Sequence, residues 1–434
     1  MIPTKTLIFL LTVWAIAALS LAFYPAAKSA WLGLGMVILF FSMIDLIQLY
    51  NIPKPEIRRE LSINLAHGET TKVSLFVRNN SASELRMQLF DDVPSSFQYE
   101  AMPVSVILEH NEVNRIEYWV KPLQRGDASF SSTWLRLKSP LRLWNRQYSI
   151  KNKSLVRVYP NFSSITKFAL LGLDNRESAM GVQQKQMRGE GLEFHQLREY
   201  RVGDSLRQID WKASIRLQKM ISREYQQERD QKIIFLLDSG RRMAATDGEY
   251  SHFDEALNSL LLLGYVALRQ GDAVGLQCFG GDNRYMPPRK GLGTINKLLN
   301  FSYDLNPKPE APDYMSAVKN LLKREKRRSL VIWLTNLRDD DAEELKPTIR
   351  LLRKHHLVLV ANLKETFLDK FEKSIPENFE EALTISAATE FKQKRAETLS
   401  TLSHEGAVLV DTIPSLLPAA LVNAYLEIKA SGKL

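Results

Sequence analysis

Beyond Lys232 the chain alternates short apolar runs with amphipathic segments of helical periodicity, and this alternation restricts the fold more than any other feature. The runs are short and rich in β-branched residues, which is typical of buried strands. They read K-I-I-F-L-L-D from 232, D-A-V-G-L-Q-C-F from 272, S-L-V-I-W-L-T from 329, L-V-L-V-A-N-L from 357 and A-V-L-V-D from 407. We therefore predict a doubly wound, Rossmann-like α/β domain over residues 232–434, with a parallel sheet covered on both faces.

The amphipathic segments between these runs predict the covering helices. We place them at residues 253–269, 293–301, 314–327, 342–354, 378–404 and 414–429. The basic run Lys323–Arg328 ends one of them, where positive charge complements the helix dipole. Cys278 is the single cysteine and falls inside an apolar strand, so we interpret it as a buried small hydrophobe and not as a nucleophile.

A second pattern, alternation of apolar and polar residues with period two, runs from Ile57 to Tyr159. It predicts antiparallel strands joined by turns, including strands at 72–78, 85–90, 104–108 and 115–120. Several short strands in about a hundred residues indicate a β-sandwich, which we place at residues 53–160. Nothing in it has the spacing of a metal site or a nucleophile, so we interpret it as a spacer or docking domain.

The first fifty residues carry only three charges, Lys5, Lys28 and Asp45, among long apolar runs. Residues 7–23 and 30–49 approach or reach the ~20 residues that a helix needs to cross a bilayer. The second run starts within a few residues of the first, unlike a cleaved signal peptide with its single apolar core. We therefore predict an anchor of two transmembrane helices over residues 1–52.

The basic residues that flank these runs predict their orientation. Lys54, Arg58 and Arg59 follow the second run, Lys5 precedes the first, and the loop between them offers only Lys28. The positive-inside rule then places both termini and the soluble domains in the cytoplasm. Asp45 is the one charge inside a predicted span. It either makes a helix-packing contact or lies near the membrane interface, and both interpretations stay open.

The net charge of the chain, +9, is a moderate positive excess. In a protein held at a bilayer it suits an anionic cytoplasmic leaflet, so lipid is an expected partner. Nucleic-acid binding calls for a basic stripe interleaved with aromatic residues, and the sequence has none. We therefore predict no nucleic-acid partner.

Residues 161–231 form a predicted connecting segment, whose most informative part reads R-E-Y-R-V-G-D-S-L-R-Q-I-D-W from Arg198. Gly203 and Asp204 predict a turn, with Asp204 capping a short helix that begins near Ser205. Trp211 has the size and the indole N–H of a buried anchor.

The charges of this run have two interpretations. Arg198, Arg201 and Arg207 are able to neutralise an anionic ligand. Nearby carboxylates, among them Asp204 and Asp210, are able to pair with the same arginines. We favour the second interpretation, a self-satisfied charge network that fastens the segment to the sheet.

The run and the strand that ends at Asp238 together resemble the MoxR-associated domain-of-unknown-function 58 family, whose C-terminal half is similar to a von Willebrand factor A module. The resemblance covers roughly residues 120–430. The positions that carry it are Gly189, Gly191, Arg198, Tyr200, Arg201, Gly203, Asp204, Arg207, Asp210, Trp211 and Asp238. It implies that the predicted α/β domain is von Willebrand A-like.

Von Willebrand A modules that bind a divalent cation end their first strand in Asp-x-Ser-x-Ser and add a Thr and an Asp from two later loops. The corresponding residues here are Asp238, Ser239, Gly240, Arg241 and Arg242, then Asp313, then Thr335 and Asn336. Glycine and arginine replace both hydroxyls, Asn336 supplies an amide where a carboxylate is expected, and Pro312-Asp313-Tyr314 replaces the Thr loop. Because a hard cation prefers oxygen ligands, we expect no bound metal, Mg²⁺ included, and no other cofactor.

This edge of the sheet is then expected to serve as an interaction face. Arg241 or Arg242 would pair with Asp238, with Asp313 or with a carboxylate of a partner. An internal ion pair with no partner is the structural alternative.

No catalytic motif is present, since G-x-S-x-G, H-E-x-x-H and a Walker loop are all missing from the sequence. We therefore predict that the chain is not an enzyme. The resemblance implies an adaptor at the bacterial inner membrane, which works beside a MoxR-type AAA+ ATPase in the assembly or maturation of client complexes. Two alternatives stay open, namely a hydrolase that uses the charged 198–210 segment and a cation-dependent adhesion module.

Overall fold

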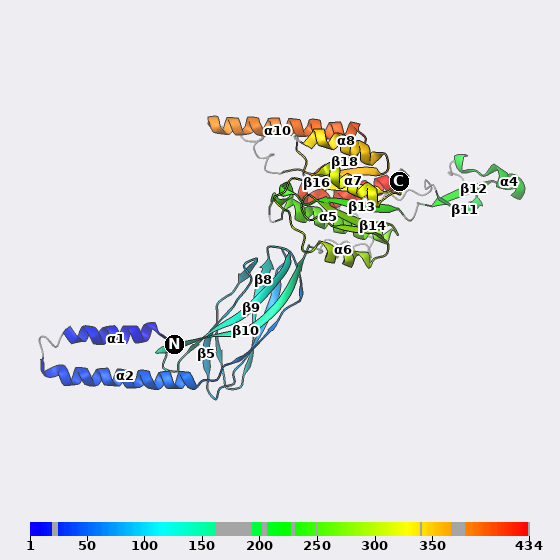
Figure 1. Ribbon diagram of the computed structural model, residues 1–434. Helices are drawn as coiled ribbons and strands as arrows, with labels where there is room; N and C mark the ends of the chain where they lie inside the picture. The colour runs from blue at the N-terminus through cyan, green and yellow to red at the C-terminus, as the bar shows by residue number, and fades with distance from the viewer. Residues whose placement is uncertain are drawn as a thin grey trace. The chain divides into compact units, whose positions relative to one another are not determined.

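The computed structural model describes residues 1–19, 25–161, 193–201, 206–226, 231–248, 250–338, 341–365 and 378–432. The chain divides into two compact units, Met1–Val158 and Tyr159–Leu434 (Figure 1). The first unit holds the predicted anchor together with nearly all of the predicted sandwich. The second holds the described parts of the connecting segment and the α/β domain.

The N-terminal helices are α1, Lys5–Ala17, and α2, Lys28–Asn51, with a 3-10 turn, η2, at Pro25–Ala27 before α2. Among the described residues, α2 is the one helix long and apolar enough to cross a membrane, whereas α1 is apolar but has only 13 residues. The second span therefore stays a prediction.

Two tryptophans hold α1 and α2 together. The rings of Trp14 and Trp31 stack with centroids 4.4 Å apart, and each indole N–H donates to the carbonyl oxygen of the other residue, at 3.1 and 3.0 Å. Gly35 leaves room for the ring of Trp14, because a Cβ atom there would lie 2.7 Å from it.

Two antiparallel sheets form the rest of the first unit, which confirms a sandwich-like arrangement. One sheet has the order β1-β10-β9-β5-β7, with β3 pairing to β10, and the other has the order β2-β4-β8-β6. The strands are β1 Ile2–Pro3, β2 Glu56–Glu60, β3 Asn64–Ala66, β4 Thr71–Arg78, β5 Leu85–Asp91, β6 Phe97–Glu100, β7 Val104–Leu108, β8 Val113–Pro122, β9 Gly126–Lys138 and β10 Trp144–Tyr159. Alternate residues of the longer strands fill the core between the sheets, as the period-two pattern predicted.

A buried ion pair lies within this core. Arg59 and Asp91 have fully buried side chains, and Arg59 donates to Asp91 from Nε at 2.9 Å and from a terminal nitrogen at 2.5 Å. The hydroxyls of Tyr118 and Thr133 also donate to the Asp91 carboxylate. Every neighbour of this carboxylate is thus a donor, which is the condition for keeping a charge out of water.

The second unit is built on a mixed six-stranded sheet with the order β15-β14-β13-β16-β17-β18. Five strands are parallel, and they confirm all the predicted ones: β13 Lys232–Asp238, β14 Ala273–Phe279, β16 Leu330–Thr335, β17 Leu357–Leu363 and β18 Val408–Thr412. The helices are α5 His252–Arg269, α6 Thr294–Ser302, α7 Tyr314–Arg324, α8 Ala342–Arg353, α10 Phe379–His404 and α11 Leu417–Ala430, the last preceded by the turn η7 Pro414–Leu416. One core joins the sheet to α5, α6 and α11, and the other joins it to α7, α8 and α10, so both faces are covered (Figure 1).

The sequence did not predict β15, Tyr285–Arg289, which pairs antiparallel with β14 at one edge of the sheet. It contains Pro287 and Pro288, which sequence patterns assign to turns. Gly275 of β14 makes the pairing possible, because a Cβ atom there would lie only 2.8 Å from the nitrogen of Pro288.

Candidate functional site

The first candidate site lies where the parallel strands end at their carboxyl termini. Strand β13 lies between β14, the next strand in sequence, and β16, which comes later in the chain. Open α/β sheets bind ligands where the strand order reverses in this way. Asp238 ends β13, and Thr335 ends the neighbouring β16.

Asp238 is the central group of this site and is almost fully buried. Its carboxylate accepts hydrogen bonds from the backbone N–H of Gly240 and from the Thr335 hydroxyl, both at 2.7 Å. Burial raises the pKa of Asp238 to about 6, because desolvation disfavours the charged form, while the two hydrogen bonds oppose this shift. Gly240 and Gly280 permit the close packing, since a Cβ atom at either would lie within 3.0 Å of Asp238 Oδ1.

Arg242 forms an ion pair beside Asp238, but not with the predicted residues. It lies in the 3-10 turn η5, Arg241–Ala244, and pairs with Asp341, with both side chains largely buried. Arg242 follows β13, and Asp341 lies between β16 and α8. Because β13 and β16 are neighbours in the sheet, Arg242 and Asp341 come together. Asp313, the other predicted partner, instead caps α7 by accepting from the N–H of Ser316 at 2.8 Å. The ion pair of Arg242 is thus internal and is made with Asp341, while the charge of Arg242 also opposes the rise that burial causes in the pKa of Asp238. Pairing with a partner's carboxylate stays a prediction.

Asn336 extends the site along the edge, and its neighbours were not predicted. Its side-chain nitrogen lies 3.1 Å from Nδ1 of His252 and 3.3 Å from a carboxylate oxygen of Glu365. Arg338 lies 3.5 Å from the same Glu365 oxygen, and burial lowers the pKa of His252. Glu365 follows the parallel strand β17, so a search of every strand's carboxyl end would have found it.

The donor set of this edge does not suit a divalent cation. Within the described ranges, no group of three or more His, Cys, Asp or Glu side chains is arranged to hold a metal ion. Gly240 supplies no hydroxyl, the Ser239 hydroxyl donates to the carbonyl oxygen of Phe279 at 2.8 Å, and the Arg242 guanidinium contributes positive charge. The absence of a bound cation stays a prediction with a physical reason.

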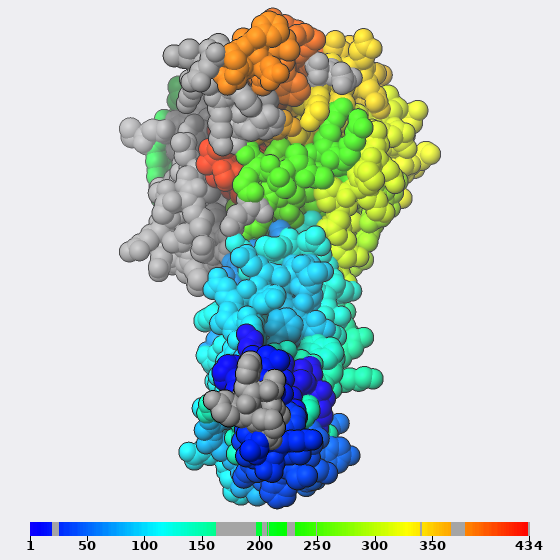
Figure 2. Space-filling view, turned by 90° about the vertical axis from the view of Figure 1, so that its left-hand side faces the viewer, coloured from blue at the N-terminus to red at the C-terminus, as the bar shows by residue number. Residues whose placement is uncertain are grey.

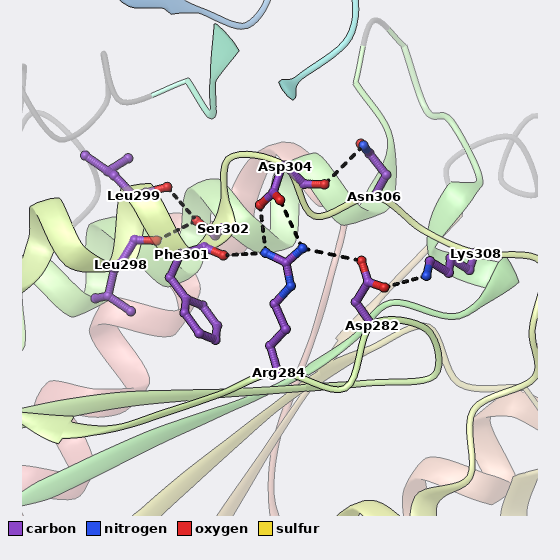
Figure 3. A network of polar contacts seen from close by, with 9 residues as sticks. All are labelled: Asp282, Arg284, Leu298, Leu299, Phe301, Ser302, Asp304, Asn306 and Lys308. Atoms are coloured by element: carbon purple, nitrogen blue, oxygen red, sulfur yellow. Dashed lines mark hydrogen bonds and ion pairs between the residues drawn. The ribbon is translucent and has the colours of Figure 1, made fainter. Parts of the chain in front are cut away.

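A polar cavity of about 210 Å³ lies beside this edge, between the loop after β14 and α7. Arg284, at its wall, is held by Asp304 at 2.8 and 3.0 Å and by the carbonyl oxygen of Phe301 at 3.3 Å (Figure 3). Asp282 lies 3.7 Å from Arg284 and also pairs with Lys308. These contacts fix the loop after β14, so the cavity wall is pre-formed.

We expect the pKa of Asp238 to make stability depend on pH. Its folded pKa, about 6, exceeds the unfolded value of about 3.8, so the stability associated with the neutral acid is complete below pH 4 and lost as pH rises through 6. As pH rises from 4 to 7, the free energy of unfolding of the wild type should fall by roughly 2–3 kcal/mol. Asp238→Asn, a neutral isostere, should not show this fall. Urea unfolding at four pH values measures this difference, and parallel curves for the two proteins would contradict it.

The second candidate site is the segment around the charged run, which folds as a two-stranded ribbon. Strand β11, Glu193–Glu199, pairs antiparallel with β12, Ile221–Gln226. Between them lie the 3-10 turn η4, Leu206–Gln208, and the helix α4, Trp211–Leu217. We call residues 193–226, in their described parts, the signature ribbon.

The structure places only some of the predicted signature residues. Arg198, Tyr200, Arg201, Asp210 and Trp211 are described, with Arg198 in β11 and Asp210 before α4. Four of the predicted positions lie outside the described residues: Gly189, Gly191, Gly203 and Asp204. The side chain of Arg207 lies outside them too. The predicted Asp204 cap therefore lies outside the described residues.

Asp210 organises the part of the ribbon that is described. Its carboxylate accepts from the N–H of Ala213 at 3.0 Å, capping α4, and pairs with Arg223 of β12 at 2.9 Å. These two contacts, the Ala213 hydrogen bond first, hold the pKa of Asp210 below its usual value. Lys219 and Glu199 pair across the ribbon at 2.7 Å. These two ion pairs join parts of the ribbon to one another, whereas the predicted network of Arg198, Arg201 and Arg207 stays a prediction.

Trp211 is 63% exposed, so its predicted role as a buried anchor is wrong. Because Asp210 caps α4, Trp211 begins the helix, and Ile215, four residues later, lies on the same face and is 79% exposed. Other large apolar side chains of the ribbon are exposed with them: Leu197, Leu206, Leu217 and Met220. Several exposed large apolar side chains within one short segment are a feature expected of a protein-binding site.

Comparison with known proteins finds similarity to a family over part of the chain. Residues 196–397 match the family described as protein of unknown function DUF58. The match begins in the signature ribbon and includes Asp238, Thr335 and Asn336. No curated protein matches the chain.

Solved structures resemble only part of the chain. A PapD-like domain of human CEP192 is 14% identical over 24% of this chain and 90% of its own, with a TM-score of 0.18. The FixG-related protein from Vibrio parahaemolyticus is 10% identical over 24% of this chain and 94% of its own, with a TM-score of 0.17. Escherichia coli alpha-2-macroglobulin is 12% identical over 24% of this chain and 9% of its own, with a TM-score of 0.19.

Proposed function

With the DUF58 match over residues 196–397 as the premise, we propose that the chain is a membrane-anchored adaptor that binds a partner protein through its signature ribbon. The observation that carries this proposal is the exposed pair Trp211 and Ile215 on α4. Large apolar side chains held on a short rigid element are the usual anchors of protein interfaces. Their place within the matched segment supports a role in binding.

The chemistry around the patch supports a partner with acidic groups beside an apolar pocket. Lys212 and Arg216 are exposed on α4 next to Trp211 and Ile215, and no ion pair involves either of them in the described part of the chain. Positive groups at the rim of an apolar patch favour association with a surface of opposite charge.

The resemblance supplies the identity of the proposed partner, a MoxR-type AAA+ ATPase. It would provide the nucleotide chemistry for which this chain has no motif, in the assembly or maturation of client complexes. The adaptor would be held at the inner membrane by two helices, with both soluble domains in the cytoplasm and a von Willebrand A-like α/β domain. The internal contacts of Asp238 and Arg242 are the reason for proposing docking at the ribbon and not at that edge.

The hydrolase alternative is less well supported. A general acid in the charged segment needs a carboxyl group with a raised pKa. The pKa of Asp210 is instead lowered by its hydrogen bond from Ala213 and its contact with Arg223, which suits a permanently ionised cap.

Co-purification from native membranes tests the adaptor proposal. The tagged full-length protein should recover an AAA+ ATPase, and the double change Trp211→Ala, Ile215→Ala should weaken its binding at least ~30-fold, which corresponds to about 2 kcal/mol for interface anchors. Phe379→Ala with Leu383→Ala is the matched control, because this pair is also exposed at a spacing of four on a helix, α10.

Circular dichroism and thermal unfolding establish that both variants are folded. Recovery of the ATPase by the control but not by the ribbon variant is the expected result. Equal recovery by both variants would refute docking at the ribbon. If mild crosslinking recovers no ATPase with the wild type, the proposed partner is wrong.

A further inference from the structure

The tip of the hairpin between β9 and β10, residues 139–144, is attached to the apolar helix α2. Asp45 of α2 is fully buried and accepts hydrogen bonds from the Ser139 hydroxyl at 2.5 Å and from the N–H groups of Leu141 at 2.8 Å and Leu143 at 3.1 Å. The indole N–H of Trp144 donates to the carbonyl and hydroxyl oxygens of Ser42, at 3.1 and 3.0 Å. Asp45, whose role the sequence left open, thus attaches α2 to the sandwich.

The same tip is also attached to the start of α1. The backbone N–H of Thr4 donates to the carbonyl oxygen of Leu143 at 2.9 Å, and the Thr4 hydroxyl donates to that of Arg142 at 2.7 Å. Strand β1 pairs with the first residues of β10 immediately beside these contacts. Figure 2 shows α1 and α2 from the end that points away from the sandwich, with their blue atoms in front of the cyan sandwich.

The length of α2 fixes the depth of the tip if α2 crosses a bilayer. Ser42 is the first residue of α2 that the hairpin binds, and the 14 residues from Lys28 to Phe41 precede it. At 1.5 Å per residue they span about 21 Å, whereas the hydrocarbon layer is about 30 Å thick. The whole helix, at about 36 Å, spans it easily. About 9 Å of the hydrocarbon layer is therefore left for the part of α2 after Phe41, beside which the hairpin tip lies.

The tip is suited to such a position because its backbone N–H groups are paired. Asp45 satisfies the N–H groups of Leu141 and Leu143, and Thr4 satisfies the carbonyl oxygens of Arg142 and Leu143. Unpaired backbone groups are what exclude irregular chain from the hydrocarbon region. The side chain of Leu141 takes no part in these contacts, and Leu141 is 48% exposed.

A belt of cationic and aromatic side chains lies next to the tip. Arg146 donates to the carbonyl oxygen of Tyr50 at 2.7 Å, and its guanidinium lies 4.6 Å from the ring centroid of Tyr148 and 5.1 Å from that of Tyr50. Lys54 lies 5.6 Å from the same Tyr148 ring. Aromatic and basic residues gather at the headgroup level of membranes.

We propose that the β9–β10 tip is inserted into the membrane, where Leu141 contacts the acyl chains of phospholipids and Arg146 and Lys54 lie at their phosphates. The sandwich then binds the lipid surface directly, in addition to being tethered by the helices. This inference rests on the membrane anchoring in the proposed function and is independent of the partner protein.

Spin labelling of the full-length protein in phosphatidylethanolamine and phosphatidylglycerol nanodiscs tests it. Cys278 is buried, and burial raises the pKa of its thiol to about 12, so a single introduced cysteine is labelled selectively. The test site is Leu141→Cys. Leu123→Cys is the matched control, because Leu123 is 51% exposed and precedes β9, at the opposite end of the sandwich. Leu39→Cys, midway along α2, reports on the helix itself.

Power saturation then compares the accessibility of each label to oxygen and to a water-soluble nickel chelate. Leu141 should resemble Leu39, with an oxygen-to-nickel ratio several-fold above that of Leu123. If Leu39 is lipid-exposed but Leu141 matches Leu123, insertion of the tip is wrong while the anchoring stands. If all three labels favour nickel, the membrane anchoring itself is wrong and the inference fails with it.

Discussion

Asp91→Ala should lower the free energy of unfolding of the sandwich by about 3–5 kcal/mol, because it leaves a buried arginine without its counter-charge. Arg59 and Asp91 are both fully buried, and Arg59 donates to Asp91 through two nitrogens. The hydroxyls of Tyr118 and Thr133 lose their acceptor in the same change. Hydrogen–deuterium exchange of the full-length protein in nanodiscs measures the loss in peptides from residues 56–159.

Glu117→Ala is the control for this change. Its partners, Lys72 and Arg115, belong to the same sandwich, but all three side chains are exposed. Exposed ion pairs contribute little to stability, so exchange should hardly change. A loss below about 1 kcal/mol for Asp91→Ala would mean that Arg59 finds water or another acceptor after the substitution.

Asp272→Ala should have a comparable effect on the second unit, about 3–5 kcal/mol. The Asp272 carboxylate accepts from the ammonium of Lys429 at 2.7 Å and from the hydroxyl of Tyr425 at 2.5 Å. All three groups are buried, and they join α11 to the start of β14. Amide exchange in residues 273–279 and 417–430 should accelerate first.

The control in this unit is Glu405→Ala, which removes the pair between the partly exposed Glu405 and the exposed Arg350. Peptides from the first unit serve as an internal reference for Asp272→Ala, and peptides from the second unit serve the same purpose for Asp91→Ala. Unchanged exchange in α11 after loss of Asp272 would show that packing alone holds this helix.

The sequence predicted the strands of both units because each has a clear hydrophobic period. Continuous apolar runs such as Ile233–Leu237 stand out, and so does the alternation of residues 72–78. The same approach missed β15, because its two prolines indicate a turn and its pairing depends on Gly275 in another strand. The described helix α1, Lys5–Ala17, is shorter than the predicted span 7–23, whose residues 20–23 lie outside the described residues.

The candidate site was predictable only where strand ends identify it. Asp238 and Thr335 were found because the carboxyl ends of neighbouring parallel strands meet at one edge. Asp341 was missed as the partner of Arg242, because the two are 99 positions apart in sequence and only the order of the strands brings them together. Trp211 was misplaced because its size suggested burial, whereas exposure depends on what covers α4.

The two prolines of β15 also limit how another chain can bind at that edge of the sheet. Unpaired N–H and C=O groups at a sheet's edge invite strand addition, the mode by which many peptides dock and by which sheets aggregate. Pro287 and Pro288 have no N–H to offer, so this edge cannot form a continuous ladder with an incoming strand. A guest at this border would have to be recognised by side-chain shape and charge, which discriminates between sequences in a way that backbone pairing does not.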